Sequence, residues 1–101
     1  MLVDEIKRRI TVAMKAHNTL EKEILRVALG EIQTAESRGA ATTDEMAAAV
    51  VRKLIKSNGE TLASTTDEAA KQTLADENVV LEDVRRATQV IARSLLDLLV
   101  K

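Results

Sequence analysis

The residues of this sequence best suited to ligand binding are basic side chains within the stretch KLIKSNGETLAS, residues 53–64. Lys53, Lys56 and Glu60 are spaced three and four residues apart, so a helix would place them on one face, with Arg52 beside them. Cations grouped in this way can contact nucleic-acid phosphates and release condensed counterions. The alternative is a solvated face with a Lys56–Glu60 pair, which contributes only about 0.2–0.5 kcal/mol. Spacing alone favours this second interpretation.

Groups that could act in catalysis or bind a metal are sparse. His17 is the one side chain that titrates near neutral pH without help, and its neighbours supply no nucleophile at a recognisable spacing. Cysteine is absent, and so are a glycine-rich phosphate loop and the G-x-S-x-G and H-E-x-x-H motifs. We therefore expect no autonomous enzyme activity, no metal and no cofactor. Four acidic pairs occur, three of them at predicted helix starts where they favour capping: Asp4-Glu5, Asp44-Glu45, Asp67-Glu68 and Asp76-Glu77.

The composition predicts an all-α protein, a small bundle of four to five helices in a single domain over residues 1–101. Hydrophobic residues make up 46% and charged residues 31% of 101 residues, and proline is absent. Without aromatic residues, the core must be aliphatic, and bases cannot stack on protein rings. The formal net charge of -1 gives no overall attraction to nucleic acid or to membranes. With no signal-like start and no membrane span, we expect a cytoplasmic protein without a membrane partner.

Two helices are predicted in the first part of the chain. Apolar residues from Val3 to Ala13 recur at three- and four-residue steps, with His17 at the expected end of this helix. Asn18 then acts as an N-cap with a reciprocal Glu21, and Gly39 stops the second helix after Arg38. This second helix has a broad apolar sector, which indicates a central helix with two or more neighbours. The sector comprises Leu20, Ile24, Leu25, Val27, Ala28, Leu29, Ile32 and Ala35.

The third helix is predicted to begin at a capping box formed by Thr42 and Glu45. The pair Asn58-Gly59 falls on its core-facing side, and glycine costs about 1 kcal/mol inside a helix. We therefore expect the helix to weaken near Asn58 and to end within residues 53–60. Its core face comprises Met46, Val50, Val51, Leu54 and Ile55.

The remaining residues are predicted to form two helices that can join into one, with a break near residues 76–78. Thr65 and Glu68 form the capping box at the start. Glu77 interrupts an otherwise apolar stripe, and the part from Leu81 to Leu99 is the strongest amphipathic pattern in the chain. We therefore expect a C-terminal amphipathic helix over about residues 81–100. The stripe comprises Ala70, Leu74, Leu81, Val84, Ile91, Leu95, Leu98 and Leu99.

An ordered set of short motifs resembles the GatB/YqeY family. Residues 23–29 with Ile32 and Glu36 are similar to that family's "LR…I…E" helix. Residues 53–61 resemble its K-x-x-K-x-x-x-E-S segment, and residues 69–75 resemble its A-G-R-x-x-L-A turn. The opening helix, with Met14-Lys15-Ala16, also fits, so the resemblance covers about residues 2–84.

This resemblance implies a non-catalytic helical module that binds tRNA or associates with a tRNA-dependent amidotransferase or an aminoacyl-tRNA synthetase. The family includes free-standing YqeY-like proteins and the tail domain of the GatB subunit, and such amidotransferases use glutamine as the amide donor. Carried over by position, the tRNA-binding residues would be Arg26, Lys53, Lys56 and Lys71, with Glu60 orienting the lysines.

The sequence also departs from the family pattern. Basic residues are common in the family where Asn58 and Gly59 stand, a Y-L-P element has no counterpart, and the usual second helical domain is replaced by the leucine-rich stripe. An alternative function is therefore a protein–protein interaction module without nucleic acid, in which the Leu81–Leu99 stripe packs on a second copy or another partner.

Overall fold

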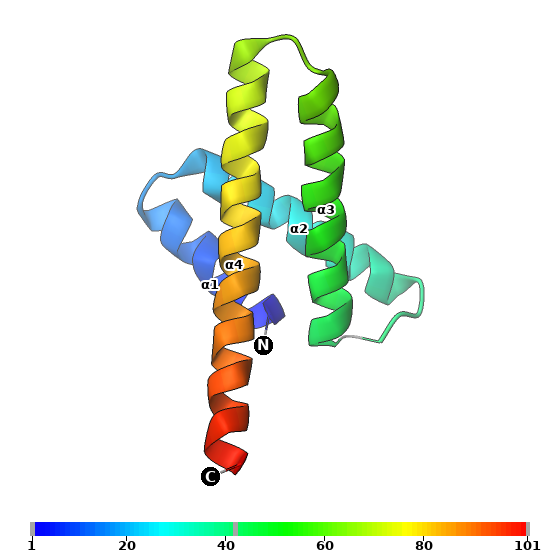
Figure 1. The fold of residues 1–101 in the computed structure, drawn as a ribbon, viewed down its shortest axis with the longest axis vertical. Coiled ribbons are helices and arrows are strands. Elements are labelled where there is room, and N and C mark those ends of the chain that lie inside the picture. The colour runs from blue at the N-terminus through cyan, green and yellow to red at the C-terminus, as the bar shows by residue number, and fades with distance from the viewer. Residues whose placement is uncertain (1, 42, 101) are drawn as a thin grey trace.

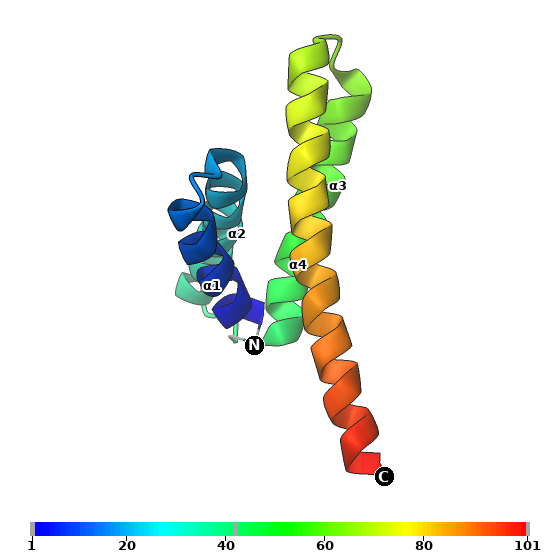
Figure 2. The same cartoon turned by 90° about the vertical axis from the view of Figure 1, so that its left-hand side faces the viewer.

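The computed structural model describes residues 2–41 and 43–100, including all of their side chains except those of residues 88–95. The described residues contain no strand, so the predicted all-α bundle is confirmed. Two helical hairpins form two layers, α1 with α2 and α3 with α4, and α2 runs steeply across the second hairpin (Figures 1 and 2). The helices are α1 (Leu2–Lys15), α2 (Thr19–Ser37), α3 (Asp44–Ser64) and α4 (Glu68–Val100).

The aliphatic core lies between these two layers. The predicted contact of the second helix with two or more neighbours is confirmed, because α2 contacts α1, α3 and α4, as each of the four helices contacts the other three. One member of its predicted apolar sector, Val27, is 49% exposed instead, since it lies at the edge of that sector and faces solvent. The largest fully buried side chains come from all four helices: Leu2, Ile6, Leu25, Ile32, Val51, Leu81 and Val84.

The predicted boundaries of α2 are confirmed by hydrogen bonds at its start and backbone angles at its end. Asn18 Oδ1 accepts from the Glu21 backbone N–H at 3.2 Å, while Asn18 Nδ2 donates to Glu21 Oε2 at 3.1 Å. At the other end Gly39 has φ 95°, a left-handed conformation that glycine adopts without a Cβ clash. The predicted end of the first helix is also confirmed, because His17, with φ 56°, lies in the turn after α1.

The caps of α3 and α4 differ from the predicted ones. Thr42 lies outside the described residues, and the residue that caps α3 is Thr43, whose Oγ1 accepts from the Met46 N–H at 3.1 Å. Asp67 caps α4 through Oδ1, which accepts from the Ala69 N–H at 3.1 Å. Thr65 does not cap α4, because its hydroxyl donates back to the Thr61 carbonyl at 2.6 Å and so belongs to the end of α3.

The predicted end of the third helix within residues 53–60 is wrong, because α3 continues through Asn58-Gly59 to Ser64. Tertiary contacts with α4 support it there. Asn58 Nδ2 donates to Glu77 Oε1 over a long 3.5 Å, and Asn78 Nδ2 donates to the Ile55 carbonyl at 3.2 Å. Packing of this kind outweighs a weak local preference against helix.

The last 33 helical residues form one uninterrupted helix, so no break occurs near residues 76–78. Leu81 and Val84 are fully buried in the core, whereas the far end of α4 extends away from the other three helices (Figures 1 and 2). Among the described residues, none of the helices has the combination of length and apolar content needed to cross a bilayer.

Candidate functional site

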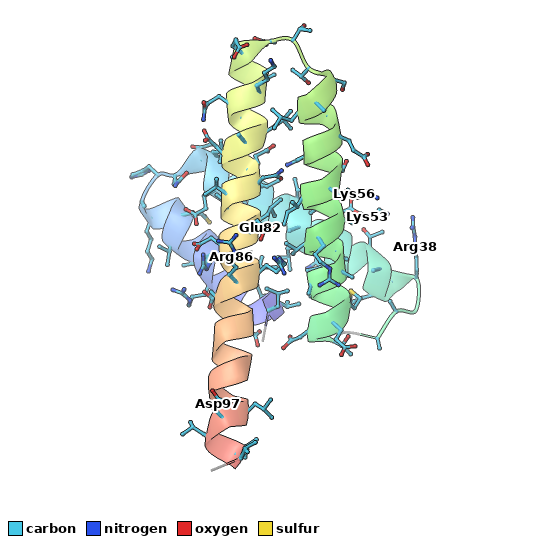
Figure 3. All side chains as sticks on the ribbon, in the orientation of Figure 1. Arg38, Lys53, Lys56, Glu82, Arg86 and Asp97 are labelled. Carbon is cyan, nitrogen blue, oxygen red and sulfur yellow. The ribbon has the colours of Figure 1, made fainter. Side chains whose placement is uncertain are left out.

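The predicted basic face of the third helix is present, and Lys53 and Lys56 form no ion pair with the residues that the structure describes. Lys53 and Lys56 are exposed on α3, one turn apart, and point to the same side of the molecule (Figure 3). Among the described residues, neither lysine has a carboxylate oxygen within 4.0 Å. Glu60 is exposed as well and does not pair with Lys56, so the structure shows no orienting contact of the kind that the resemblance implies.

The end of α2 adds a third cation to this side of the molecule. A groove of about 300 Å³ lies between α2 and α3, and both Arg38 and Lys53 line it. Figure 3 shows Arg38 at the end of α2 on the same side as Lys53 and Lys56. Arg38 is placed there by the helix stop at Gly39, because its backbone N–H still bonds to the carbonyls of the last turn. We call Arg38, Lys53 and Lys56 the α2–α3 basic patch.

Polar groups that can bind or repel an anion also line this groove. The hydroxyl of Ser57 lies on the α3 side, and that of Thr34 on the α2 side donates to the Gly30 carbonyl at 2.9 Å. One carboxylate, Glu31, lines the groove too. Within the groove, the two cations Arg38 and Lys53 outnumber this single acid, which gives its lining a positive balance that the whole-chain charge of -1 does not reveal.

The other two predicted tRNA-binding residues lie apart from the patch. Arg26 extends from α2 toward α1, where its Nη2 lies 3.8 Å from Met14 Sδ. Lys71 lies in the first turn of α4 and pairs with Glu68 Oε1 at 3.4 Å. Lys53 is 11 residues from the end of α3, so at 1.5 Å per residue it lies roughly 12 Å further from the α3–α4 turn than Lys71 does. Only two of the four predicted residues therefore share one surface.

Sequence reasoning missed Arg38 as a functional candidate. Helical periodicity relates residues within one helix, and Arg38 meets Lys53 only because the chain folds back between α2 and α3. The one available signal was the position of Arg38 before Gly39 at a helix end, which by itself indicates a favourable interaction with the helix dipole.

Two residues of the basic cluster Lys7-Arg8-Arg9 in α1 have a structural role. Glu5 Oε1 accepts from Arg8 Nη2 at 2.7 Å and from Arg9 Nε at 2.8 Å. Arg9 Nη1 also donates to Asp83 Oδ2 at 2.9 Å, which joins α1 to α4. Hydrogen bonds from Arg8 and Arg9 lower the pKa of Glu5 from 4.5 to about 2. Lys7, the remaining member, is exposed.

A half-buried polar cluster lies where α2, α3 and α4 meet. Glu77 points into the apolar stripe as predicted and reaches Asn58. Burial raises the pKa of the Glu77 carboxyl, and the nearby charge of Glu23 on α2 raises it further. Asn78 Oδ1 is buried without a hydrogen-bond partner among the described residues. Of the two neighbouring acids, Glu77 is half-buried and Glu23 is exposed.

The remaining candidates for chemistry occupy structural positions. His17 is exposed in the α1–α2 turn, beside the Asn18 cap. Many serine and threonine hydroxyls donate to carbonyls one turn earlier, as Ser37 does to Gln33 at 3.0 Å. Asp44 accepts from the Leu2 N–H at 3.0 Å, and this bond lowers its pKa. Within residues 2–41 and 43–100, no three His, Cys, Asp or Glu side chains gather closely enough to hold a metal ion.

Comparisons with known proteins return no match for this chain. No protein-family model matches it, and neither do any curated proteins or solved structures. The assignment of function therefore depends on the residues and geometry described above.

Proposed function

We propose that this protein is a non-catalytic GatB/YqeY-like helical module that binds tRNA through the α2–α3 basic patch. The observation that carries the proposal is the presence of Arg38, Lys53 and Lys56 on one side of the molecule, without ion-pair partners among the described residues. When lysines and arginines without ion-pair partners bind phosphates, little free energy is spent on breaking existing interactions, because no internal ion pair has to be broken. A tRNA-dependent amidotransferase or an aminoacyl-tRNA synthetase would be the protein partner.

The positions of the basic residues favour one part of the resemblance over the other. Lys53 and Lys56 come from the family-like segment, and Arg38 extends their surface across the groove. Arg26 lies beside α1 and Lys71 at the start of α4, so a tRNA bound to the patch would contact them only if it also covered those two surfaces. The core proposal therefore concerns the patch, and Arg26 and Lys71 are secondary contacts. Backbone phosphates would supply the affinity, since the chain has no aromatic residue on which bases can stack.

Binding to labelled bulk tRNA over a range of salt concentrations tests this function. The Lys53→Ala/Lys56→Ala variant removes two cations of the patch. We expect it to weaken binding at every salt concentration and to flatten the slope of log K against log salt by roughly 1.5–2. The matched control is Lys7→Ala/Lys15→Ala, which removes the same charge from exposed positions on α1. Equal losses in both variants, or no binding even at low salt, would contradict the proposal.

A further inference from the structure

The groove between α2 and α3 contains an acid whose charge the described part of the chain leaves unpaired. Glu31 lines this groove together with Arg38 and Lys53. It is exposed, and no charged nitrogen of the described residues lies within 4.0 Å of its carboxylate. Glu31 and Arg38 share one face of α2 and lie roughly 10 Å apart along its axis, at 1.5 Å per residue. The carboxylate is therefore available to a ligand that the two cations also contact.

The α2 wall of the groove offers a second hydrogen-bond acceptor. Thr34 lies on the same face of α2, between Glu31 and Arg38. Its hydroxyl donates to the Gly30 carbonyl at 2.9 Å, so its oxygen can only accept a hydrogen bond from a ligand. Arg38 and Lys53, by contrast, are charged donors without an acceptor atom. The groove thus suits a ligand that carries anions and hydroxyl donors close together.

We propose that Glu31 accepts a hydrogen bond from a ribose 2′-hydroxyl while Arg38 and Lys53 bind adjoining phosphates, so that the groove selects RNA over DNA. The RNA backbone carries a phosphate and a hydroxyl donor in every nucleotide, and the DNA backbone lacks this hydroxyl. The groove can identify RNA in this way without reading bases, which suits a chain that has no aromatic residue for stacking. This inference rests on the proposed tRNA-binding function and adds the residue that determines its selectivity.

The charge of Glu31 has opposite effects on the two nucleic acids. A carboxylate repels the phosphates of RNA and DNA alike. In RNA alone, the 2′-hydroxyl can donate to it, and a hydrogen bond to a charged acceptor is stronger than one between neutral groups. Glu31 consequently strengthens the binding of RNA and weakens the binding of DNA. A solvated acid without this role would weaken both equally.

Three labelled stem-loops of one sequence test this inference at low salt: RNA, DNA, and 2′-fluoro RNA, which keeps the helical form of RNA but lacks the hydroxyl donor. The natural protein should bind RNA roughly tenfold more tightly than the other two, as expected for one hydrogen bond to a charged group. Glu31→Ala should bind RNA more weakly and DNA slightly more tightly, so that the preference for RNA disappears.

The matched control is Asp97→Ala, which removes the same charge from an exposed position at the far end of α4, away from the patch (Figure 3). It should keep the tenfold preference. Both substituted side chains are exposed, so circular dichroism should show unchanged helix content in both variants.

Two results would overturn this inference and leave the tRNA-binding function in place. Equal tightening of RNA and DNA binding by Glu31→Ala would show that the acid only repels phosphates. Binding of 2′-fluoro RNA as tightly as RNA would show that the helical form is recognised and the hydroxyl is not. Absence of binding by all three probes would overturn both this inference and the proposed function.

Discussion

Glu77 is an acid held in a place that favours its neutral form. It contacts Asn58 from within an apolar stripe, and Glu23 lies close enough to repel its charge. Its pKa in the folded protein is raised above the ordinary value of 4.5. The protonated carboxyl therefore favours folding below about pH 4.5, and this contribution is lost as the pH rises through the folded-state pKa.

The variant Glu77→Gln should consequently be more stable than the natural protein at pH 7 and no more stable near pH 4. An amide keeps the contact with Asn58 without a charge that must be desolvated. Thermal unfolding followed by circular dichroism across this pH range measures the difference. Glu60→Gln serves as the control, since Glu60 is exposed and should leave the melting temperature unchanged. A lower melting temperature for Glu77→Gln at pH 7 would contradict this account.

The roles of single residues were predictable from the sequence where their partners are close in the sequence, as at helix caps. Asn18 with Glu21, and Gly39 after Arg38, follow directly from capping chemistry, and the structure confirms both. The role of Arg9 could not be predicted, because its partner Asp83 is 74 residues away. Half of the predicted tRNA-binding set was likewise dispersed by the fold, with Arg26 directed toward α1 and Lys71 placed at the start of α4.

At the scale of whole helices, α3 shows why local signals can mislead. Asn58-Gly59 predicted a helix end, yet α3 continues for one and a half further turns to Ser64. The stabilising contacts come from α4, through Glu77 and Asn78, and no local pattern reveals them. The uninterrupted α4 follows from the same pairing, because each helix of the hairpin supports the other where its own sequence is weakest.

The two glycines Gly59 and Gly39 should respond oppositely to the same change. Gly59 is helical with nothing within 4 Å of an added Cβ, so Gly59→Ala should stabilise the protein by about 0.5–1 kcal/mol. Gly39 has φ 95°, so Gly39→Ala should destabilise it by roughly 1–2 kcal/mol. Urea unfolding of the two variants provides the measurement. Destabilisation by Gly59→Ala would indicate that α3 is not helical at this position.

For the molecule as a whole, the ion-pair network of α1 joins the two layers. Glu5 fixes Arg9, and Arg9 reaches Asp83 on α4, so one carboxylate contributes to both a helix and an interface. Its low pKa, about 2, means that the network stabilises the protein above pH 4.5 and that this contribution is lost between about pH 4.5 and 2.

We therefore expect Glu5→Gln to lower the free energy of unfolding at pH 7 by about 1–2 kcal/mol, as for loss of charged hydrogen bonds. The difference from the natural protein should shrink as the pH falls and vanish near pH 2. Urea titrations at several pH values measure both. A difference that stays constant down to pH 2 would show that the carboxylate charge is not the cause.

The order of the helices along the chain has a consequence during synthesis on the ribosome. Helices α1 and α2 are complete at Ser37, but their core is complete only after Leu81 and Val84, which pack in it together with Ala47 and Val51 of α3, have been added. At roughly 5–20 residues per second, the intervening 44 or so residues take about 2–9 s. Until then the aliphatic face of the nascent first hairpin is at most partly covered, by α3, and this exposed apolar surface makes the incomplete chain prone to aggregation.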